Sequence, residues 1–223
     1  MVEASLKTLA LFALAAAATV LVSQVVVTGQ PASSPNPAEQ VLEDFSKAEP
    51  DGFPQGWQAS RSEAATRKAY VIQKEGEQSF LRTKGIDDQA RIKRRVAWNP
   101  KEYPIVQWRW RLRSAPSQGQ NLIATVFITL DTDLLLIPVF TKYAWHASGT
   151  AGALTEGGMF SGSEILVRTG VQPVGQWVEE RVNAYADFLK IHKHEPSPQA
   201  WGISLVTGPG IELDFGSIRL AKQ

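Results

Sequence analysis

The chain has 223 residues, with 23 Lys and Arg against 22 Asp and Glu, and it has no cysteine. This length accommodates one folded domain with a hydrophobic core. The lack of cysteine excludes disulfides, thiol catalysis, zinc–cysteine sites and a lipoprotein anchor. The net charge of +1 conceals an uneven distribution, because residues 61–113 contain 14 Lys and Arg against 6 Asp and Glu, whereas residues 114–223 contain 7 against 10. This distribution predicts a local basic patch, and nucleic acid is not an expected partner.

The N-terminal segment predicts a membrane anchor. After Lys7 the next charged residue is Glu39, and residues 8–27 form a 20-residue run of almost entirely apolar or small side chains. As a helix this run is about 30 Å long, which is the thickness of a bilayer's hydrocarbon core. We therefore predict a single transmembrane helix within residues 1–28. A cleaved signal peptide is the alternative, although the run exceeds the roughly 7–15 apolar residues typical of one.

Two further features bear on this predicted helix, and a third concerns the residues after it. Lys7 favours a cytoplasmic N-terminus, which places the rest of the chain outside the bacterial inner membrane, in the periplasm. Ala13 and Ala17 lie four residues apart and give one helix face a smooth surface, which favours packing against another membrane helix. Residues 29–40 contain three prolines among small polar side chains. This composition predicts a linker.

Residues 41–223 predict one β-rich domain. Candidate strands cover residues 41–45, 57–60, 68–73, 80–83, 91–98, 105–113, 121–130, 136–143, 164–169, 176–182, 199–207 and 211–220. Gly and Pro separate these runs, and only residues 183–193 have apolar side chains at helical spacing. We predict a mainly β fold, an antiparallel jelly-roll-like β-sandwich with one short helix.

Two of the expected strands alternate between apolar and basic side chains. In residues 105–113, Trp108 and Trp110 share one face and arginines occupy the other. Burying the arginines would cost more, so we predict that both tryptophans lie in the core. Residues 91–98 alternate in the same way. If the two strands are neighbours, they form one basic face for an acidic protein or anionic headgroups, made of Arg91, Lys93, Arg95, Arg109, Arg111 and Arg113.

A Gly- and Ser-rich stretch covers residues 146–164 and predicts a long loop. Met159 and Phe160 within it form either an apolar docking tip or a segment that folds back onto the core. Together with Tyr143 and Trp145, which come just before the loop, they are candidates for contacting a ligand or partner.

Residues that would support catalysis or metal binding form no convincing set. His192, His194 and Glu195 have poor metal-ligand spacing and lack a clear further ligand. Glu179 and Glu180 are adjacent, so they point to opposite faces of a strand, whereas a glycosidase needs two carboxylates on one side of a cleft. Asp131 and Asp133 fit an ordinary turn, and His146 fits a loop cap. We therefore predict no catalytic residues, no metal and no cofactor.

Several short motifs resemble one bacterial family. The segments PIVQWRWRL, ATVFI, KYAWHASG, GQWVEERVNAYADFLKIHKHEP and GISLVTGPGIELDFGSIRL, with FPQGW upstream, are similar to the family called domain of unknown function 3047 over roughly residues 41–220. The resemblance implies an exported jelly-roll-like β-sandwich and implies no activity. It also implies an acidic pair where this chain has Gln120 and Asn121. The terminal FGSIRL is similar to galactose-binding-like sandwiches, a group that includes sugar-binding and protein-docking members.

These features favour a non-catalytic, membrane-anchored β-sandwich that serves as a structural or docking subunit of a larger membrane protein complex, for example an energy-transducing one. Its partners are then the lipid bilayer and other proteins of that complex. The alternative is a carbohydrate-binding module for an anionic envelope glycan. A glycan hydrolase is the third hypothesis.

Overall fold

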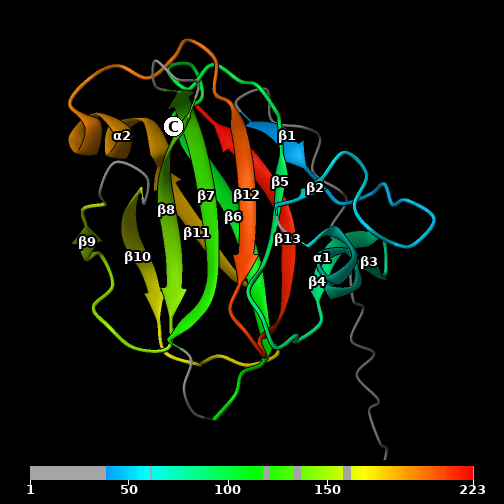
Figure 1. Ribbon diagram of the computed structural model, residues 1–223. Coiled ribbons are helices and arrows are strands. Elements are labelled where there is room, and N and C mark those ends of the chain that lie inside the picture. The colour runs from blue at the N-terminus through cyan, green and yellow to red at the C-terminus, as the bar shows by residue number, and fades with distance from the viewer. Residues whose placement is uncertain (1–38, 61, 118–120, 133–136, 158–161, 223) are drawn as a thin grey trace, which may run out of the picture. The chain divides into compact units, whose positions relative to one another are not determined.

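The computed structural model describes residues 39–60, 62–117, 121–132, 137–157 and 162–222, all of which lie in one compact unit, Pro35–Gln223. Within these residues two sheets lie face to face, with β7, β8 and β12 in front of β6, β11 and β13 in Figure 1. The prediction of a mainly β sandwich is confirmed. Its finer description as a jelly roll stays a prediction.

The first sheet has six strands among the described residues, in the order β11-β6-β13-β4-β3, with β1 also paired to β13. All its strand pairs are antiparallel. Its strands are β1 (Glu39–Glu43), β3 (Tyr70–Glu75), β4 (Gln78–Thr83), β6 (Ile105–Ser114), β11 (Val178–Asn183) and β13 (Glu212–Ala221).

The second sheet has seven strands in the described part of the chain, in the order β2-β5-β12-β7-β8-β10-β9. Its strands are β2 (Gln58–Ala59), β5 (Ala90–Arg94), β7 (Leu122–Thr132), β8 (Pro138–His146), β9 (Leu154–Thr155), β10 (Ser163–Thr169) and β12 (Gly202–Thr207). Strands β8 and β10 are parallel, so the sandwich departs here from the antiparallel pairing predicted throughout. A parallel pair needs a long connection, and the chain between these strands contains β9, which the sequence did not predict.

Aromatic side chains from both sheets fill the space between them. Trp108 and Trp110 of β6 are 2% and 0% exposed, which confirms their predicted place in the core. Their rings contact each other edge to face at 5.6 Å. Each also meets a ring of β8, because Trp108 lies 5.9 Å from Tyr143 and Trp110 lies 5.4 Å from Trp145. These contacts join the two sheets through large apolar surfaces, which supply most of the stabilising burial in such a fold.

Two short helices accompany the sheets in the described residues. The helix α2 (Ala184–His192) confirms the helix predicted over residues 183–193. Asn183 caps its first turn by accepting a hydrogen bond from the Ala186 amide at 2.9 Å, and Lys193 ends it in the left-handed conformation. The helix α1 (Glu63–Ala69) was not predicted. It takes up the first residues of a run that the sequence assigned to a strand over residues 68–73.

The predicted membrane anchor within residues 1–28, including Ala13 and Ala17, lies outside the described residues. Among the residues that the structure describes, no helix is long and apolar enough to cross a membrane. The anchor and the periplasmic location therefore stay predictions.

Candidate functional site

The six cations predicted to form one basic face lie on two different sheets. Strand β5 belongs to the seven-stranded sheet and β6 to the six-stranded sheet, so they are not neighbours. Arg91 and Lys93 lie on β5 and Arg95 directly after it, while Arg109, Arg111 and Arg113 lie on β6. The expectation of one continuous basic face is wrong, because alternation along a strand fixes which side chains share a face but not which sheet the strand joins.

On the outer face of the six-stranded sheet, the arginines surround a buried carboxylate. Asp214 of β13 is 0% exposed. It accepts hydrogen bonds from Arg111 Nε at 2.9 Å and from Arg82 Nε at 2.8 Å. Arg111 also donates to Glu75 at 2.9 Å, and Arg113 lies 3.9 Å from Asp214. These carboxylates neutralise much of the positive charge that the sequence places on this face.

Two rings hold Arg111 and the nearby Arg109 in place. The Trp177 ring centroid lies 4.5 Å from the Arg109 guanidinium carbon and 4.4 Å from that of Arg111. Phe80 meets Trp177 edge to face at 5.7 Å and lies 5.3 Å from the Arg111 guanidinium carbon. Guanidinium groups stack favourably on aromatic faces. Around Asp214, this face is therefore a closed network of ions and rings, which stabilises the sheet.

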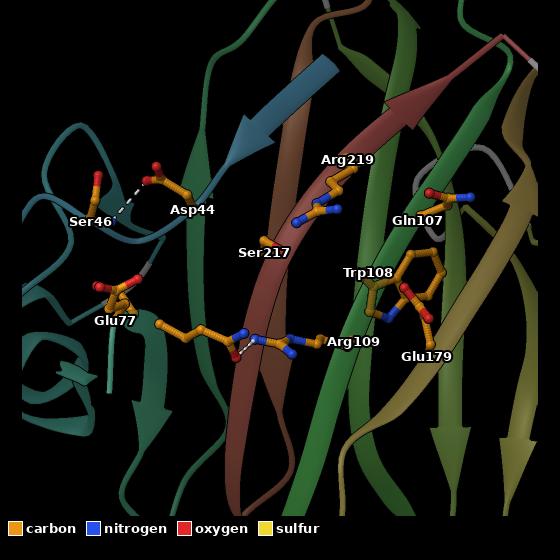
Figure 2. A pocket seen from close by; sticks show the side chains of 11 residues that line it. Asp44, Ser46, Glu77, Gln107, Trp108, Arg109, Glu179, Ser217 and Arg219 are labelled. Carbon is orange, nitrogen blue, oxygen red and sulfur yellow. Dashed lines mark hydrogen bonds between the residues drawn. The ribbon is translucent and has the colours of Figure 1, made fainter. Parts of the chain in front are cut away.

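A polar hollow of about 320 Å³ opens beside this network (Figure 2). Strands β6 and β13 form its floor, and its rim comes from the residues after β1, from the β3–β4 turn and from β11. Its lining residues are Asp44, Ser46, Glu77, Gln78, Ser79, Gln107, Trp108, Arg109, Glu179, Ser217 and Arg219. Arg109 donates to the Gln78 side chain at 2.8 Å across the hollow.

The outer face of the seven-stranded sheet carries cations beside aromatic rings. The Arg91 guanidinium carbon lies 4.2 Å from the centroid of Phe127. Phe127 in turn lies 5.2 Å from Phe140. At the end of the sheet the Arg95 guanidinium carbon lies 4.0 Å from the centroid of Trp201. Trp201 and Phe140 are both partly exposed.

Strand pairing aligns one row of this face across five strands. Lys93 of β5 pairs with Ser204 of β12, and Ser204 pairs with Phe127 of β7. Phe127 then pairs with Lys142 of β8, which pairs with Glu164 of β10. Residues in register lie side by side on the same face. The row therefore places a lysine on either side of an aromatic ring and a hydroxyl.

Three cations of this face have no carboxylate partner. Within the described ranges, Lys93, Arg95 and Lys142 form no ion pair. Glu164, the carboxylate of the row, lies 3.4 Å from His146 Nε2 instead. Lys93 and Arg95 are exposed and Lys142 is partly exposed. These three charges are thus available to an external anion.

The predicted ligand-contacting aromatics Tyr143 and Trp145 are not at the surface. Both are 0% exposed and belong to the core. Trp145 Nε1 donates to the Gly170 carbonyl at 2.7 Å, and the Tyr143 hydroxyl donates to Asp187 of α2 at 3.0 Å. The prediction failed because both side chains occupy inward positions of β8, where Phe140 and Lys142 alternate outward. Met159 and Phe160 lie outside the described residues.

The adjacent carboxylates confirm the alternation expected of them. Glu180 points inward and accepts from Trp110 Nε1 at 3.1 Å and from Arg168 Nε at 2.5 Å, whereas Glu179 is exposed on the outer face. Burial raises the pKa of Glu180, although Arg168 opposes that shift. A general acid and a base facing one cleft are not formed by this pair.

The histidine pair at the end of α2 packs against a ring. His192 lies 4.3 Å from the Phe188 ring, and His194 lies 5.3 Å from it. Among the residues the structure describes, no three His, Asp or Glu side chains converge on a position that could hold a metal ion.

Sequence reasoning did not find the rings on the seven-stranded sheet. Phe127 lies in the run ATVFITL, where consecutive apolar residues hide the alternation that marks a face. A signal was nevertheless present, because an uninterrupted apolar strand indicates that both of its faces are covered. Trp201 was absent from the candidates because the sequence assigned it to the interior of an expected strand over residues 199–207, whereas β12 begins after it, at Gly202.

Neither a protein-family model nor a curated protein matches this sequence. Several solved structures resemble the fold. A carbohydrate-binding module that recognises mannan is 11% identical, with 83% of this chain and 98% of that chain covered and a TM-score of 0.42. A family 11 carbohydrate-binding module from Clostridium thermocellum, solved with a β-1,3-1,4-mixed-linked tetrasaccharide, is 10% identical, with coverages of 82% and 95% and a TM-score of 0.43.

Endoglucanase Cel12A from Rhodothermus marinus is 11% identical, with 67% of this chain and 84% of that chain covered and a TM-score of 0.40. The ligands and activities of these neighbours belong to those proteins. The resemblance to the domain of unknown function 3047 family stays a prediction.

Proposed function

We propose that this domain is a non-catalytic binding module for an acidic polysaccharide, which it binds along the outer face of the seven-stranded sheet. The observation that most directly supports this proposal is the set of three cations without carboxylate partners in the described residues, Lys93, Arg95 and Lys142, beside partly exposed rings. A cation with no internal partner gains more from an external anion than one already paired within the fold.

The rings favour a sugar over a simple anion. Aromatic side chains provide large, rigid apolar surfaces against which the C–H faces of a sugar ring can pack. Arg95, stacked on Trp201, presents the N–H groups at its edge, a planar arrangement that suits a carboxylate or sulfate. An acidic sugar unit offers both of the required groups.

The spacing of the cations favours a polymer. Lys93 and Lys142 lie on β5 and β8, which are separated by β12 and β7. Three strand spacings of about 4.7–4.9 Å each place the two backbones roughly 14 Å apart. A chain of several sugar units can contact both lysines, whereas a single sugar contacts one. The proposed path of the polymer therefore crosses the sheet from Lys93 to Lys142, over the Arg91 side chain. Arg91 stacks on Phe127 and donates to Ser204, and both of these residues are buried.

The membrane-anchored docking subunit remains the competing hypothesis. The same cations would attract an acidic protein, but the partly exposed rings Trp201 and Phe140 have no specific role in that hypothesis. If the predicted anchor and periplasmic location are correct, the polysaccharide is a component of the bacterial envelope. Fractionation of cells that express the full chain would test that location.

The test is affinity electrophoresis of the full chain in gels containing alginate, a polyuronate, with neutral dextran as the reference polymer. We expect retardation by alginate only, which weakens as salt screens the charges. Lys93→Gln combined with Arg95→Gln should weaken binding about tenfold, which corresponds to about 1.4 kcal/mol. The matched control is Arg113→Gln with Arg181→Gln, which removes two exposed cations from the other outer face and should leave binding unchanged.

Three results would contradict the proposal. Equal loss of binding in both double variants would show that net charge, not this face, is responsible. Equal retardation by polyglutamate would favour docking on an acidic protein. Release of reducing ends from alginate during incubation would indicate a hydrolase.

A further inference from the structure

The polar hollow on the outer face of the six-stranded sheet differs from the polymer face in shape and in chemistry. It is a defined recess of about 320 Å³, at the small end of the range for ligand pockets. Its uncharged polar side chains include Gln78, Gln107, Ser46 and Ser217, which offer both hydrogen-bond donors and acceptors. A recess of this size and polarity fits a small hydroxylated molecule.

Arg109 is held rigidly in this hollow. Its side chain crosses β13 at Gly216, where a Cβ would come within 2.4 Å of Arg109 Cγ and 2.5 Å of its Nε. Only glycine leaves room for this path. Trp177 stacks on the guanidinium, and Gln78 accepts one of its hydrogen bonds. Because its position is fixed, Arg109 loses little conformational entropy when it binds a ligand.

The charge of Arg109 is incompletely compensated. Within the described residues it forms no ion pair, and its buried Nε has no hydrogen-bond partner. Burial lowers the pKa of Arg109, and the neighbouring Arg219 lowers it further, while Glu179 acts in the opposite direction. An anion bound near these two guanidinium groups would favour their charged forms and so oppose both causes of the lowered pKa.

Arg219 supplies the second cation from β13. A β-bulge in the β6–β13 pairing lies between Phe215 and Ile218, beside Ser217. Figure 2 shows the guanidinium groups of Arg109 and Arg219 on either side of Ser217. Arg219 is half exposed and its nearest carboxylate, Glu39, lies 3.9 Å away. Two arginines and a hydroxyl therefore face the same part of the hollow.

The rim of the hollow also carries three acidic residues, Asp44, Glu77 and Glu179. Asp44 accepts from the Ser46 amide at 2.9 Å, and the Ser46 side chain lowers the pKa of this carboxylate. Glu77 and Glu179 are exposed. Carboxylates accept hydrogen bonds from sugar hydroxyls, whereas the arginines prefer an oxyanion. The two kinds of group lie in one recess, which suits a ligand that carries both hydroxyls and one negative charge.

We infer that this hollow is a second binding site, which takes a single sugar unit bearing a carboxylate, with the carboxylate between Arg109 and Arg219. The inference does not depend on the proposed polymer face, because no residue is shared between the two sites. A free uronic acid or the terminal unit of a uronate chain presents the same chemistry.

The experiment is titration of the full chain with sodium glucuronate, followed by backbone amide chemical shifts, with glucose and sodium sulfate as separate probes. We expect glucuronate to shift amides of β6 and β13 around the hollow, and to bind at least about tenfold more tightly than either control. Arg219→Gln should weaken glucuronate binding about tenfold, since a hydrogen bond to a charged group is lost. Lys93→Gln, on the opposite sheet, is the matched control and should change nothing.

Several outcomes would overturn the inference. Glucose binding as tightly as glucuronate would remove the role of the arginines, and sulfate binding as tightly would remove the role of the sugar. Shifts confined to β5, β7 and β8 would place glucuronate on the polymer face instead. Since Arg219 is half exposed, its variant should fold, and unchanged binding in that folded variant would also contradict the site. Long alginate chains have few terminal units, so they test the polymer face, whereas glucuronate tests the hollow. Loss of one kind of binding while the other is kept therefore shows which of the two proposals has failed.

Discussion

The outer faces of the two sheets both carry arginines stacked on aromatic rings, but they differ in where the carboxylates lie. On the six-stranded sheet, Asp214 and Glu75 lie among Arg82 and Arg111 and form ion pairs with them. On the seven-stranded sheet, Lys93, Arg95 and Lys142 form no ion pair within the described residues. The carboxylate in register with Lys142, Glu164, contacts His146 instead. The same residue types thus form a closed network around Asp214 on one face, beside the hollow, and leave cations without ion pairs along the other face.

This difference teaches that a basic strand is not by itself a binding surface. What decides its role is the charge on the neighbouring strands, which is set by sheet topology. Strand β6 lies beside β13, which contributes Asp214, whereas β5 lies beside β12, which contributes Ser204. A buried carboxylate converts a row of arginines into an internal network, and a serine adds no charge to pair with the neighbouring cation.

The largest expected effect comes from breaking the closed network. Asp214→Asn removes the charge that Arg82 and Arg111 share and leaves both guanidinium groups poorly compensated. We expect the free energy of unfolding to fall by about 3–5 kcal/mol, as for other broken buried ion pairs. Urea denaturation measures this change. Glu212→Gln, an exposed position on the same strand, is the control and should change stability by less than about 0.5 kcal/mol. Equal stability of the two variants would contradict the contrast between the faces.

A smaller loss is expected from crowding the Arg109 side chain. Gly216→Ala places a methyl group against Arg109 Cγ and Nε, so the side chain or the strand must shift. We expect a loss of about 1–3 kcal/mol in the free energy of unfolding, which is typical of overpacking, together with weaker glucuronate binding. Ser217→Ala, the neighbouring position, should retain most of the stability. Unchanged glucuronate binding in folded Gly216→Ala protein would show that Arg109 does not hold the ligand.

Trp201 and Trp177 each stack on an arginine of a different outer face, so their substitution should show which face binds alginate. Trp201→Ala removes the ring beneath Arg95 and should weaken alginate binding about two- to fivefold, corresponding to about 0.5–1 kcal/mol for an exposed cation–ring contact. Trp177→Ala removes the equivalent ring on the other face and should leave alginate binding unchanged. Affinity electrophoresis measures both variants. Equal effects from the two would mean that the polymer does not distinguish the sheets.

The smallest expected effect is a pH dependence of stability that arises from His192, which belongs to neither outer face. Burial lowers the pKa of His192 from its usual value of 6.5, and His194 lowers it further, whereas Asp131 opposes the shift. Below pH 6.5 the unfolded chain binds this proton more readily than the folded chain, so stability falls as pH drops from about 7 to 5. His192→Gln should flatten this decline in urea denaturation. A decline of the same size in the variant would assign the pH dependence to other groups.

The sequence predicted the parts of this molecule that depend on local pattern. Period-two alternation placed Trp108 and Trp110 in the core, and helical spacing placed α2 close to its observed bounds. Adjacent carboxylates were correctly assigned to opposite faces at Glu179 and Glu180. Each of these conclusions needs only the geometry of one strand or one helix.

The parts that the sequence missed depend on contacts between distant segments. The separation of β5 from β6 follows from their pairing with β12 and with β11 and β13, which no local pattern encodes. The hollow depends on the β13 bulge at Gly216 and Ser217, on Trp177 and on the β3–β4 turn, so its residues are scattered over the chain. Tyr143 and Trp145 were misplaced because an aromatic strand next to a loop was interpreted as exposed, although its register sends both rings inward.

The seven-stranded sheet ends in two-residue strands on both sides, β2 at one edge and β9 at the other. Such short edges offer few free backbone N–H and C=O groups to an incoming strand. Copies of the domain therefore have little means of joining edge to edge through this sheet. Any partner of this sheet must engage it through side chains, so ligand selectivity can change by substitution of those side chains while the backbone framework stays the same.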